Sequence, residues 1–356
     1  MPSANQVLIC AAGGGKTTRL AAIAFGETPR RSLLVTYTRY GKDELERKLY
    51  GLAPAIPESI EVMTWFTFLL REMARPYRPK MHHGRIEGLR FVTRRSALRI
   101  PASNVSAHYF EAGRYIYSDK IAKFICECDR QANGSIMARL AARFDNILVD
   151  EVQDLAGFDL DVLELMLRAG IKLTLVGDPR QATYKTNQSA KGSQFGKAAI
   201  IKKFEQWQRA GLLVISHECE THRCNQQIAD LGDSMFPGTP STVSRNCEVS
   251  GHDGIFVVPR GKLQLYIETY SPQILRYDRT FECLGQPAIN FGEAKGLTFD
   301  RVLIFPHGPA KKWLASGDIT HIEKSREKLY VAATRARLSL AFAYDGLAMV
   351  PHAQAF

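Results

Sequence analysis

The sequence lacks the features that are typical of membrane proteins, secreted proteins and proteins stabilised by disulfide bonds. None of its apolar runs approaches the roughly 18 residues that a membrane-spanning helix needs, and its start, MPSANQVLIC, has neither the charged region nor the long apolar stretch of a signal peptide. The seven cysteines are scattered and include no Cys-x-x-Cys pair, which argues against a disulfide framework and a ribbon-type zinc site. We therefore expect a protein of the reducing cytoplasm that does not enter a membrane.

Length and charge indicate a globular protein with an acidic partner. The chain has 356 residues, of which 45% are hydrophobic, and at roughly 100 to 200 residues per domain this length suggests two domains or three. The 47 lysines and arginines exceed the 36 aspartates and glutamates by 11, so the surface carries a net positive field. That sign favours polyanions as partners, nucleic acid first.

The first part of the chain alternates short apolar strands with helical patterns, which predicts a parallel sheet. The expected strands are residues 7–9, 33–36, 60–63, 146–149 and 172–177. Residues from about 72 to 143 break this rhythm, so we expect a small, mostly helical inserted subdomain there. It contains an arginine run that either contacts nucleic acid or is a solvated face, namely Arg85, Arg90, Arg94, Arg95 and Arg99.

A second lobe is expected beyond a boundary near residue 207. Residues 1–207 would form the first lobe, including the insertion, and residues 208–356 the second. The strand at 212–216 would open the second lobe, which has further strand candidates at 255–258, 301–305 and 338–342. The predicted fold class is α/β, with parallel sheets flanked by helices in both lobes.

A glycine-rich loop, residues 13–17, lies between a predicted strand and a predicted helix. Bare backbone N–H groups, a helix N-terminus, a lysine ammonium and a hydroxyl for Mg²⁺ are what a nucleoside triphosphate needs. The strict pattern GxxxxGK[ST] fails, because Cys10 stands where its first glycine would be. Taken alone, the segment fits a phosphate loop or a glycine-rich turn with a solvated lysine.

An acidic pair, Asp150 and Glu151, closes a predicted buried strand. Two carboxylates in that place repel each other unless a cation binds them. Asp150 would then hold Mg²⁺ and Glu151 would polarise the attacking water, whereas the alternative is a solvated turn. Gln181 follows the next strand, as a residue that senses the γ-phosphate would.

Together these residues resemble the superfamily 1 DNA helicases and translocases of the UvrD, Rep and PcrA type. The similarity runs in the same order along the chain, from Leu8 to about Leu340. Segments similar to motifs I, Ia, Ib, II, III, IV, V and VI lie at residues 11–17, 36–38, 64–68, 150–154, 177–184, 221–223, 294–300 and 329–337. Because only 66 positions separate Arg223 from Ile289, the chain resembles a compact form that lacks the large insertion in the second motor lobe.

The resemblance implies tandem RecA-like P-loop NTPase lobes with ATP and Mg²⁺ bound between them. It makes Thr17 and Asp150 metal ligands, with an arginine clamp from the second lobe. The implied catalytic residues are Glu151, Gln181, Arg223 and Arg335. The implied nucleotide-binding residues are Gly13, Gly14, Gly15, Lys16, Thr17, Thr18, Lys295 and Gly296. Tyr37, Trp65 and Tyr184 stand where the family contacts DNA, although each of these aromatics also fits a core position.

The predicted function is that of an ATP-dependent DNA helicase or single-strand DNA translocase within a larger DNA-processing or phage-defence complex. Its substrate would be single-stranded DNA or DNA with a single-stranded tail, and its partner a nuclease. The alternative is an ATP-gated DNA-binding or assembly subunit that signals nucleotide state to a nuclease. It is motivated by the shifted glycines and by Thr298, which stands where the family has a ribose-binding acid. A P-loop phosphotransferase would leave Arg335 and the second lobe unexplained.

Overall fold

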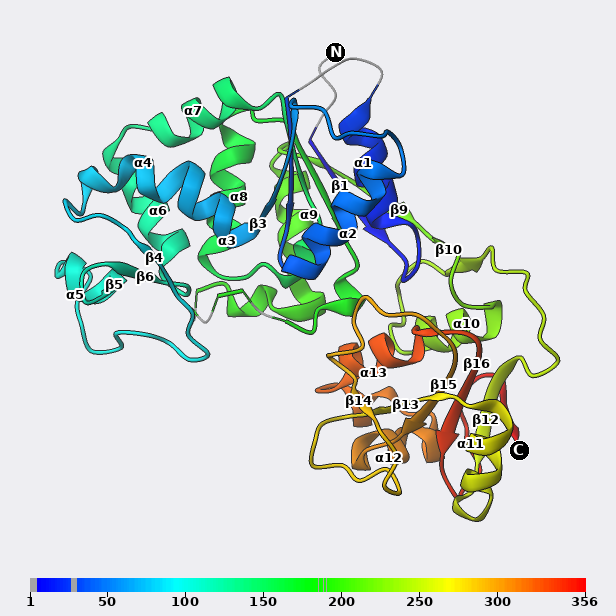
Figure 1. Cartoon of the computed structure of the whole chain (residues 1–356). Coiled ribbons are helices and arrows are strands. Elements are labelled where there is room, and N and C mark those ends of the chain that lie inside the picture. The colour runs from blue at the N-terminus through cyan, green and yellow to red at the C-terminus, as the bar shows by residue number, and fades with distance from the viewer. Residues whose placement is uncertain (1–4, 27–30, 185, 188, 190) are drawn as a thin grey trace. The chain divides into compact units, whose positions relative to one another are not determined.

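The structure is a computed structural model that describes residues 5–26, 31–184, 186–187, 189 and 191–356. The chain packs into two compact units, each with a parallel sheet flanked by helices (Figure 1). The first unit takes in residues 1–9, 16–179 and 184–216 as far as they are described, and the second takes in residues 10–15, 180–183 and 217–356. This confirms the predicted α/β class.

The first unit is built on a six-stranded sheet. Its strands, in order across the sheet, are β3 (Ile60–Thr64), β2 (Ser32–Thr36), β7 (Asn146–Val149), β8 (Leu173–Gly177), β1 (Gln6–Cys10) and β9 (Val214–Glu218). The first five are the strands that the sequence predicted, and they pair in parallel. Because parallel strands end at the same edge of a sheet, the segments after β1, β2, β7 and β8 share one edge, where α/β folds bind their ligands.

The prediction that the strand at 212–216 opens the second lobe is wrong. This segment does not open the second lobe, because β9 joins the edge of the first sheet, where the Val214 N–H donates to the Asn5 carbonyl at 2.9 Å. The first unit therefore extends to Ser216 rather than to a boundary near residue 207. An apolar run predicts that a strand forms, but it does not specify which sheet edge the strand pairs with.

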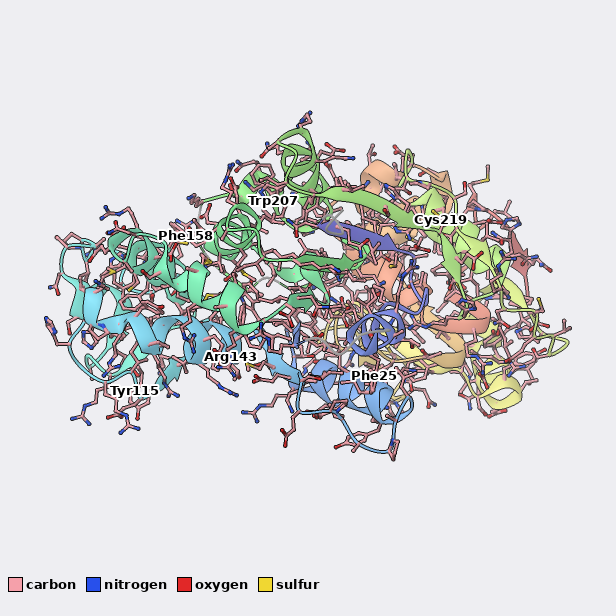
Figure 2. The ribbon with its side chains drawn as sticks, turned by 90° about the horizontal axis from the view of Figure 1, so that it is seen from above. Phe25, Tyr115, Arg143, Phe158, Trp207 and Cys219 are labelled. Carbon is pink, nitrogen blue, oxygen red and sulfur yellow. The ribbon has the colours of Figure 1, made fainter. Side chains whose placement is uncertain are left out.

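Helices cover both faces of the first sheet (Figure 1). The longer ones outside the insertion are α1 (Lys16–Phe25), α2 (Arg39–Tyr50), α8 (Phe158–Arg168) and α9 (Ile201–Arg209), with 3-10 turns at Val152–Asp154, Pro179–Gln181, Ser193–Phe195 and Lys197–Ile200. Figure 2 shows Phe158 on α8 and Trp207 on α9. These two helices are joined by the Trp207 indole N–H, which donates to Glu164 Oε2 at 3.0 Å.

The insertion lies between β3 and β7 and combines helices with a small sheet that the sequence did not predict. Its elements are α3 (Trp65–Phe68), a π-helical turn (Leu69–Ala74), α4 (Arg75–Tyr77), a 3-10 turn (Arg78–Lys80), β4 (Gly88–Arg90), α5 (Val105–Tyr109), β5 (Phe110–Glu111), β6 (Tyr115–Tyr117), α6 (Ile121–Gln131) and α7 (Ser135–Arg143). The strands form a three-stranded sheet in the order β4-β6-β5.

The insertion is fastened to the first sheet by apolar packing and by ion pairs. Ile116 and Phe124 belong to the same buried apolar cluster as Val35 and Ile147 of the main sheet. The Arg143 guanidinium, which Figure 2 labels, donates to the buried carboxylate of Glu72 at 2.9 Å and to Glu61 of β3 at 2.7 Å. The insertion is therefore an extension of the first unit and shares its core.

The second unit contains another six-stranded parallel sheet. Its order is β14 (Ile289–Asn290), β13 (Gln273–Arg276), β15 (Phe299–Phe305), β16 (Ala336–Ala343), β12 (Gly254–Val258) and β17 (Ala353–Ala355), beside a two-stranded pair β10 (Glu220–Thr221) and β11 (Val243–Ser244). Its helices are α10 (Gln226–Ser234), α11 (Leu263–Tyr270), α12 (Gly308–Ser316) and α13 (Arg326–Ala333), with 3-10 turns at Arg260–Lys262 and Ile319–Ile322.

The three strands that the sequence predicted at 255–258, 301–305 and 338–342 are β12, β15 and β16, the centre of this sheet. None of the helices in the described part of the chain combines the length and the hydropathy of a bilayer-spanning segment.

Candidate functional site

The glycine loop after β1 has the backbone conformation that only glycine adopts easily. Gly13 and Gly15 have φ values of 77° and 72°, in the left-handed region, and the Gly14 N–H closes a turn on the Ala11 carbonyl at 3.0 Å. A Cβ on Gly15 would meet no atom within 4 Å, so the backbone there is open to a ligand. The loop then enters α1, whose first residues are Lys16, Thr17 and an exposed Thr18.

Gly13 also allows the glycine loop to lie close to Thr221 and Arg223, within the second unit. A Cβ on Gly13 would lie 2.5 Å from Arg223 Cβ and 2.8 Å from Thr221 Oγ1. Thr221 Oγ1 donates to the Ala12 carbonyl at 2.6 Å, and the His222 N–H donates to the Gly13 carbonyl at 3.1 Å. The glycine loop therefore runs along the segment that contains the predicted clamp residue Arg223.

Thr17 and Asp150, the two predicted metal ligands, contact each other in the first unit. Thr17 Oγ1 donates to Asp150 Oδ2 at 3.2 Å. Burial raises the pKa of Asp150, and the neighbouring charge of Glu151 raises it further, while Lys16 acts in the opposite direction. A buried carboxyl with a raised pKa needs more positive charge nearby in order to ionise. A hydroxyl and a carboxylate are oxygen ligands of the kind that Mg²⁺ prefers, so these residues fit that ion.

Glu151 is held in an uncommon conformation by its neighbours. Its φ of 54° lies in the left-handed region, which costs a residue with a Cβ on the order of 1–3 kcal/mol. The Glu151 N–H donates to Asp150 Oδ1 at 2.9 Å, and Gln153 Nε2 donates to Glu151 Oε2. Gln153 Oε1 accepts in turn from the Asp178 N–H at 3.1 Å. The side chain of Gln153 thus joins Glu151, after β7, to the end of β8.

Sequence reasoning missed two residues of this arrangement, Gln153 and Gly177. A Cβ on Gly177 would lie 2.2 Å from Gln153 Oε1, so the glycine is what lets the amide reach Asp178. Both residues lie in segments that resemble helicase motifs, 150–154 and 177–184. Their contact could not be predicted from these segments alone, because it depends on the parallel pairing of β7 with β8.

Arg335 and Arg223 converge in the second unit. Arg335 is only 1% exposed and follows α13. Its guanidinium donates to the carbonyls of Val331 at 2.9 Å and Leu297 at 3.3 Å, and its Nη2 donates to Gln181 Oε1 at 3.0 Å. Arg223 Nη1 donates to the Thr334 carbonyl at 3.3 Å. The structure thus brings together Gln181, Arg223 and Arg335, three of the four predicted catalytic residues.

The loop with Lys295 and Gly296 contacts Arg335 through a backbone carbonyl, that of Leu297. Gly296 has a φ of 89°, and the Leu297 carbonyl that follows accepts from Arg335. The Lys295 N–H donates to the Gly292 carbonyl at 3.3 Å. Lys295 and Gly296, two of the predicted nucleotide-binding residues, therefore lie in a turn that directly precedes a partner of Arg335.

Trp65 was predicted either to contact DNA or to occupy a core position, and the structure places its side chain in the core. Its side chain is 1% exposed, its indole N–H donates to the buried Asp159 Oδ1 at 3.0 Å, and its ring packs 5.8 Å from that of Phe68. Trp65, at the start of α3, is therefore a core residue, and the only polar atom of its side chain is hydrogen-bonded to Asp159.

The two predicted tyrosines lie together instead. The ring centroids of Tyr37, after β2, and Tyr184 are 6.4 Å apart, and Tyr184 is 43% exposed. Tyr37 also packs 6.1 Å from Phe66. An aromatic surface with an exposed ring is therefore present at the edge where the strands of the first sheet end.

Comparison with known proteins gives a family and a fold. The viral superfamily 1 RNA helicase core domain family matches residues 129–343, which is more than half of the chain. No curated protein sequence matches the chain. Among solved structures, the chain is similar to the arterivirus nonstructural protein 10 helicase in complex with DNA, with a TM-score of 0.50 and 13% identity over 95% of this chain and 60% of that one.

Two further structures score lower. They are the arterivirus nonstructural protein 10 helicase, with a TM-score of 0.49 and 14% identity over 95% of this chain and 59% of that one, and the PRRSV helicase, with a TM-score of 0.46 and 16% identity over 96% and 52%. The chain thus spans between about half and three fifths of the length of these proteins. Its two parallel α/β sheets have the tandem RecA-like fold of a helicase core. The chain belongs to the viral superfamily 1 RNA helicase core domain family.

Proposed function

We propose that this chain hydrolyses ATP to move along, or to unwind, a nucleic acid. The observation that carries the proposal is the group at the ends of β1 and β7, where Thr17 contacts Asp150 and Gln153 holds Glu151. A hydroxyl and a carboxylate suited to Mg²⁺, together with a fixed carboxylate for water, are the parts that hydrolysis of a triphosphate requires. Membership of a helicase family supports the same reading.

The residues that follow β1 and β7 would divide the work of hydrolysis. The N–H groups of the glycine loop and the Lys16 ammonium bind the phosphates, and Glu151 orients the attacking water and takes its proton. Thr17 and Asp150 hold Mg²⁺, which when bound supplies positive charge to the phosphate oxygens. The hydrogen bond from Gln153 would hold the carboxylate of Glu151 in place for that water.

The arginines would make turnover depend on the second unit. Arg335 Nη2 is bonded to Gln181 Oε1, and we propose that a γ-phosphate oxygen takes the place of this amide oxygen as its acceptor. Gln181 then becomes available to the attacking water. An arginine supplied to the spreading negative charge of phosphoryl transfer is worth about 10³ to 10⁵ in rate. Arg223, which is anchored to the Thr334 carbonyl beside Arg335, would complete the clamp.

The polynucleotide would be single-stranded where it meets Tyr37 and Tyr184. The exposed ring of Tyr184, which packs beside the partly buried ring of Tyr37, supports this, because bases stack on aromatic rings in proteins that bind single strands. The predicted polymer is DNA, and a related helicase has been solved with DNA. The description of the family names RNA, so both polymers belong in the test.

Other parts of the predicted function rest on the sequence alone. The assignment to the UvrD, Rep and PcrA type, the nuclease partner and the phage-defence setting stay predictions. The reducing cytoplasm likewise stays a prediction.

Unwinding of a labelled duplex with a single-stranded tail tests the proposal against its alternative. The helicase is expected to displace the labelled strand with ATP and not with a non-hydrolysable analogue, from a DNA or an RNA duplex. If the chain binds the tail in an ATP-dependent way while neither strand displacement nor movement along a single strand is detected, the ATP-gated binding subunit is favoured instead.

A further inference from the structure

The aromatic surface of the first unit continues into the insertion through Phe91. Phe91 follows β4 directly and is 67% exposed. Its ring meets that of Phe66 edge to face, at a centroid distance of 5.3 Å and an angle of 87°. Phe66 in turn packs against Tyr37, which contacts Tyr184. The four rings form one continuous series with an exposed ring at each end.

This series differs from ordinary isolated apolar residues on a surface. A single exposed phenylalanine is common and needs no explanation. Here the buried ring of Phe66 packs against Phe91, and the insertion that carries Phe91 is fixed to the main sheet by the contact of Arg143 with Glu61 of β3. The ring therefore has a defined place beside Tyr37 and Tyr184.

The charge around Phe91 identifies the kind of partner. The exposed arginines of the run Arg85, Arg90, Arg94, Arg95 and Arg99 lie on both sides of it in the sequence, where Glu87 is the only acid between residues 85 and 99. One of them, Arg90, is paired with Glu111 at 3.2 Å. Arginines bind phosphates, and an aromatic ring between them offers a face to a base. An uncharged apolar partner would gain nothing from these arginines.

We propose that Phe91 is a base-stacking residue that extends the single-strand track from Tyr37 and Tyr184 into the insertion. The ligand is a single-stranded nucleic acid whose phosphates lie along the arginine run. This inference rests on the proposed function, and it adds a residue and a segment that the aromatic positions of the main sheet did not include. The buried Phe66 acts as a positioning residue beneath the exposed ring.

Tryptophan fluorescence offers a direct test, because the three native tryptophans, Trp65, Trp207 and Trp313, are all buried. In Phe91→Trp, the new indole is therefore the exposed one. We expect its emission to be quenched saturably by a short single-stranded oligonucleotide, and much less by a blunt duplex of the same length, whose bases are not free to stack.

Tyr50→Trp is the matched control. Tyr50 is 58% exposed, but it ends the helix that begins just after Tyr37; at 1.5 Å per residue, the helix carries it about 16 Å away from that ring. Its indole should not respond to the oligonucleotide. Quenching of both indoles alike, or stronger quenching of Phe91→Trp by the duplex, would overturn the stacking role.

Affinity supplies the second readout. Phe91→Ala should weaken single-strand binding about 5- to 100-fold, and Phe91→Tyr should restore it, because one stacked base contributes on that scale. If the wild-type chain binds the oligonucleotide and Phe91→Ala binds equally well, this inference fails while the proposed function stands. If the wild-type chain binds no single-stranded nucleic acid at all, the proposed function fails with it.

Discussion

Gly177 leaves the space that the side chain of Gln153 fills, since a Cβ on Gly177 would lie 2.2 Å from Gln153 Oε1. Through this approach Gln153 accepts from the Asp178 N–H and donates to Glu151. One side chain thereby couples the ends of two neighbouring strands, and the proposed general base depends on it for its orientation.

Gly177→Ala is expected to displace Gln153 and so to release Glu151. Steady-state ATP hydrolysis should fall by roughly tenfold or more, a part of the 10²- to 10⁴-fold that a positioned base contributes. ATP affinity should change little, because Gln153 does not belong to the glycine loop. Gly261→Ala is a suitable control, since a Cβ there meets no atom within 4 Å. Equal hydrolysis by both variants would remove Gln153 from the mechanism.

Lys16→Ala and Glu151→Gln are expected to differ in binding although both abolish hydrolysis. Lys16 contributes its ammonium to the phosphates, so its loss weakens nucleotide binding. Glu151→Gln keeps the size of the side chain and removes only the basic oxygen, so ATP should still bind. Equilibrium binding of a fluorescent ATP analogue to each variant distinguishes the two roles. An equal loss of binding in both would contradict the role assigned to Glu151.

Arg335→Ala is expected to lower turnover far more than ATP affinity, by roughly 10³-fold. Arg337→Ala serves as the control, because Arg337 lies two positions away and makes a surface ion pair with Asp300 at 2.7 Å. The buried bonds of Arg335 to the Val331 and Leu297 carbonyls are also lost, so thermal unfolding of the variant should be measured beside its kinetics. Unchanged turnover in a folded Arg335→Ala would take the residue out of the clamp.

Asp159 makes the stability of the first unit depend on pH. Burial raises its pKa from 3.8 to about 6; hydrogen bonds from Thr186, Trp65 and the Ala156 backbone oppose this shift, and the charge of Asp161 adds to it. The folded protein therefore holds this proton more tightly than the unfolded chain does. The stability that the protonated Asp159 gives the folded state is complete below about pH 4, and it is lost as the pH rises to about 6.

Asp159→Asn should remove this dependence. The shift of about 2 pKa units corresponds to roughly 3 kcal/mol, so the free energy of unfolding of the variant should rise by about that amount relative to wild type between pH 4 and pH 7. Urea unfolding at several pH values measures this difference. Parallel pH profiles of the two proteins would show that Asp159 is not the group responsible.

The sequence predicted those parts of the site whose pattern is local. The loop at Gly13 to Thr17 and the acidic pair after β7 each follow one strand, and the strand order then brings Thr17 to Asp150. Short or polar strands such as β13, β14 and β17 carry too few alternating residues to be predicted. Strand β9 was predicted as a strand but was assigned to the wrong sheet, because pairing partners are not encoded in a single apolar run.

Aromatic residues were the least predictable part of the site. Trp65 and Tyr37 both follow a strand of the first sheet, yet the indole N–H of Trp65 is buried on Asp159 whereas Tyr37 faces Tyr184. Burial of this kind depends on tertiary packing, which an aromatic side chain in an apolar stretch does not reveal. Phe91 was overlooked for the opposite reason, because the arginines around it dominate the pattern of the insertion.

The measurement that tests the central claim most directly is ATP hydrolysis by the whole chain with and without single-stranded DNA or RNA, at two salt concentrations, with Glu151→Gln as the background. We predict strong stimulation by at least one polymer, and stimulation that fades as salt weakens the phosphate contacts. Hydrolysis that neither polymer alters, in a chain that binds both ATP and the polymer, would contradict a nucleic-acid-driven motor.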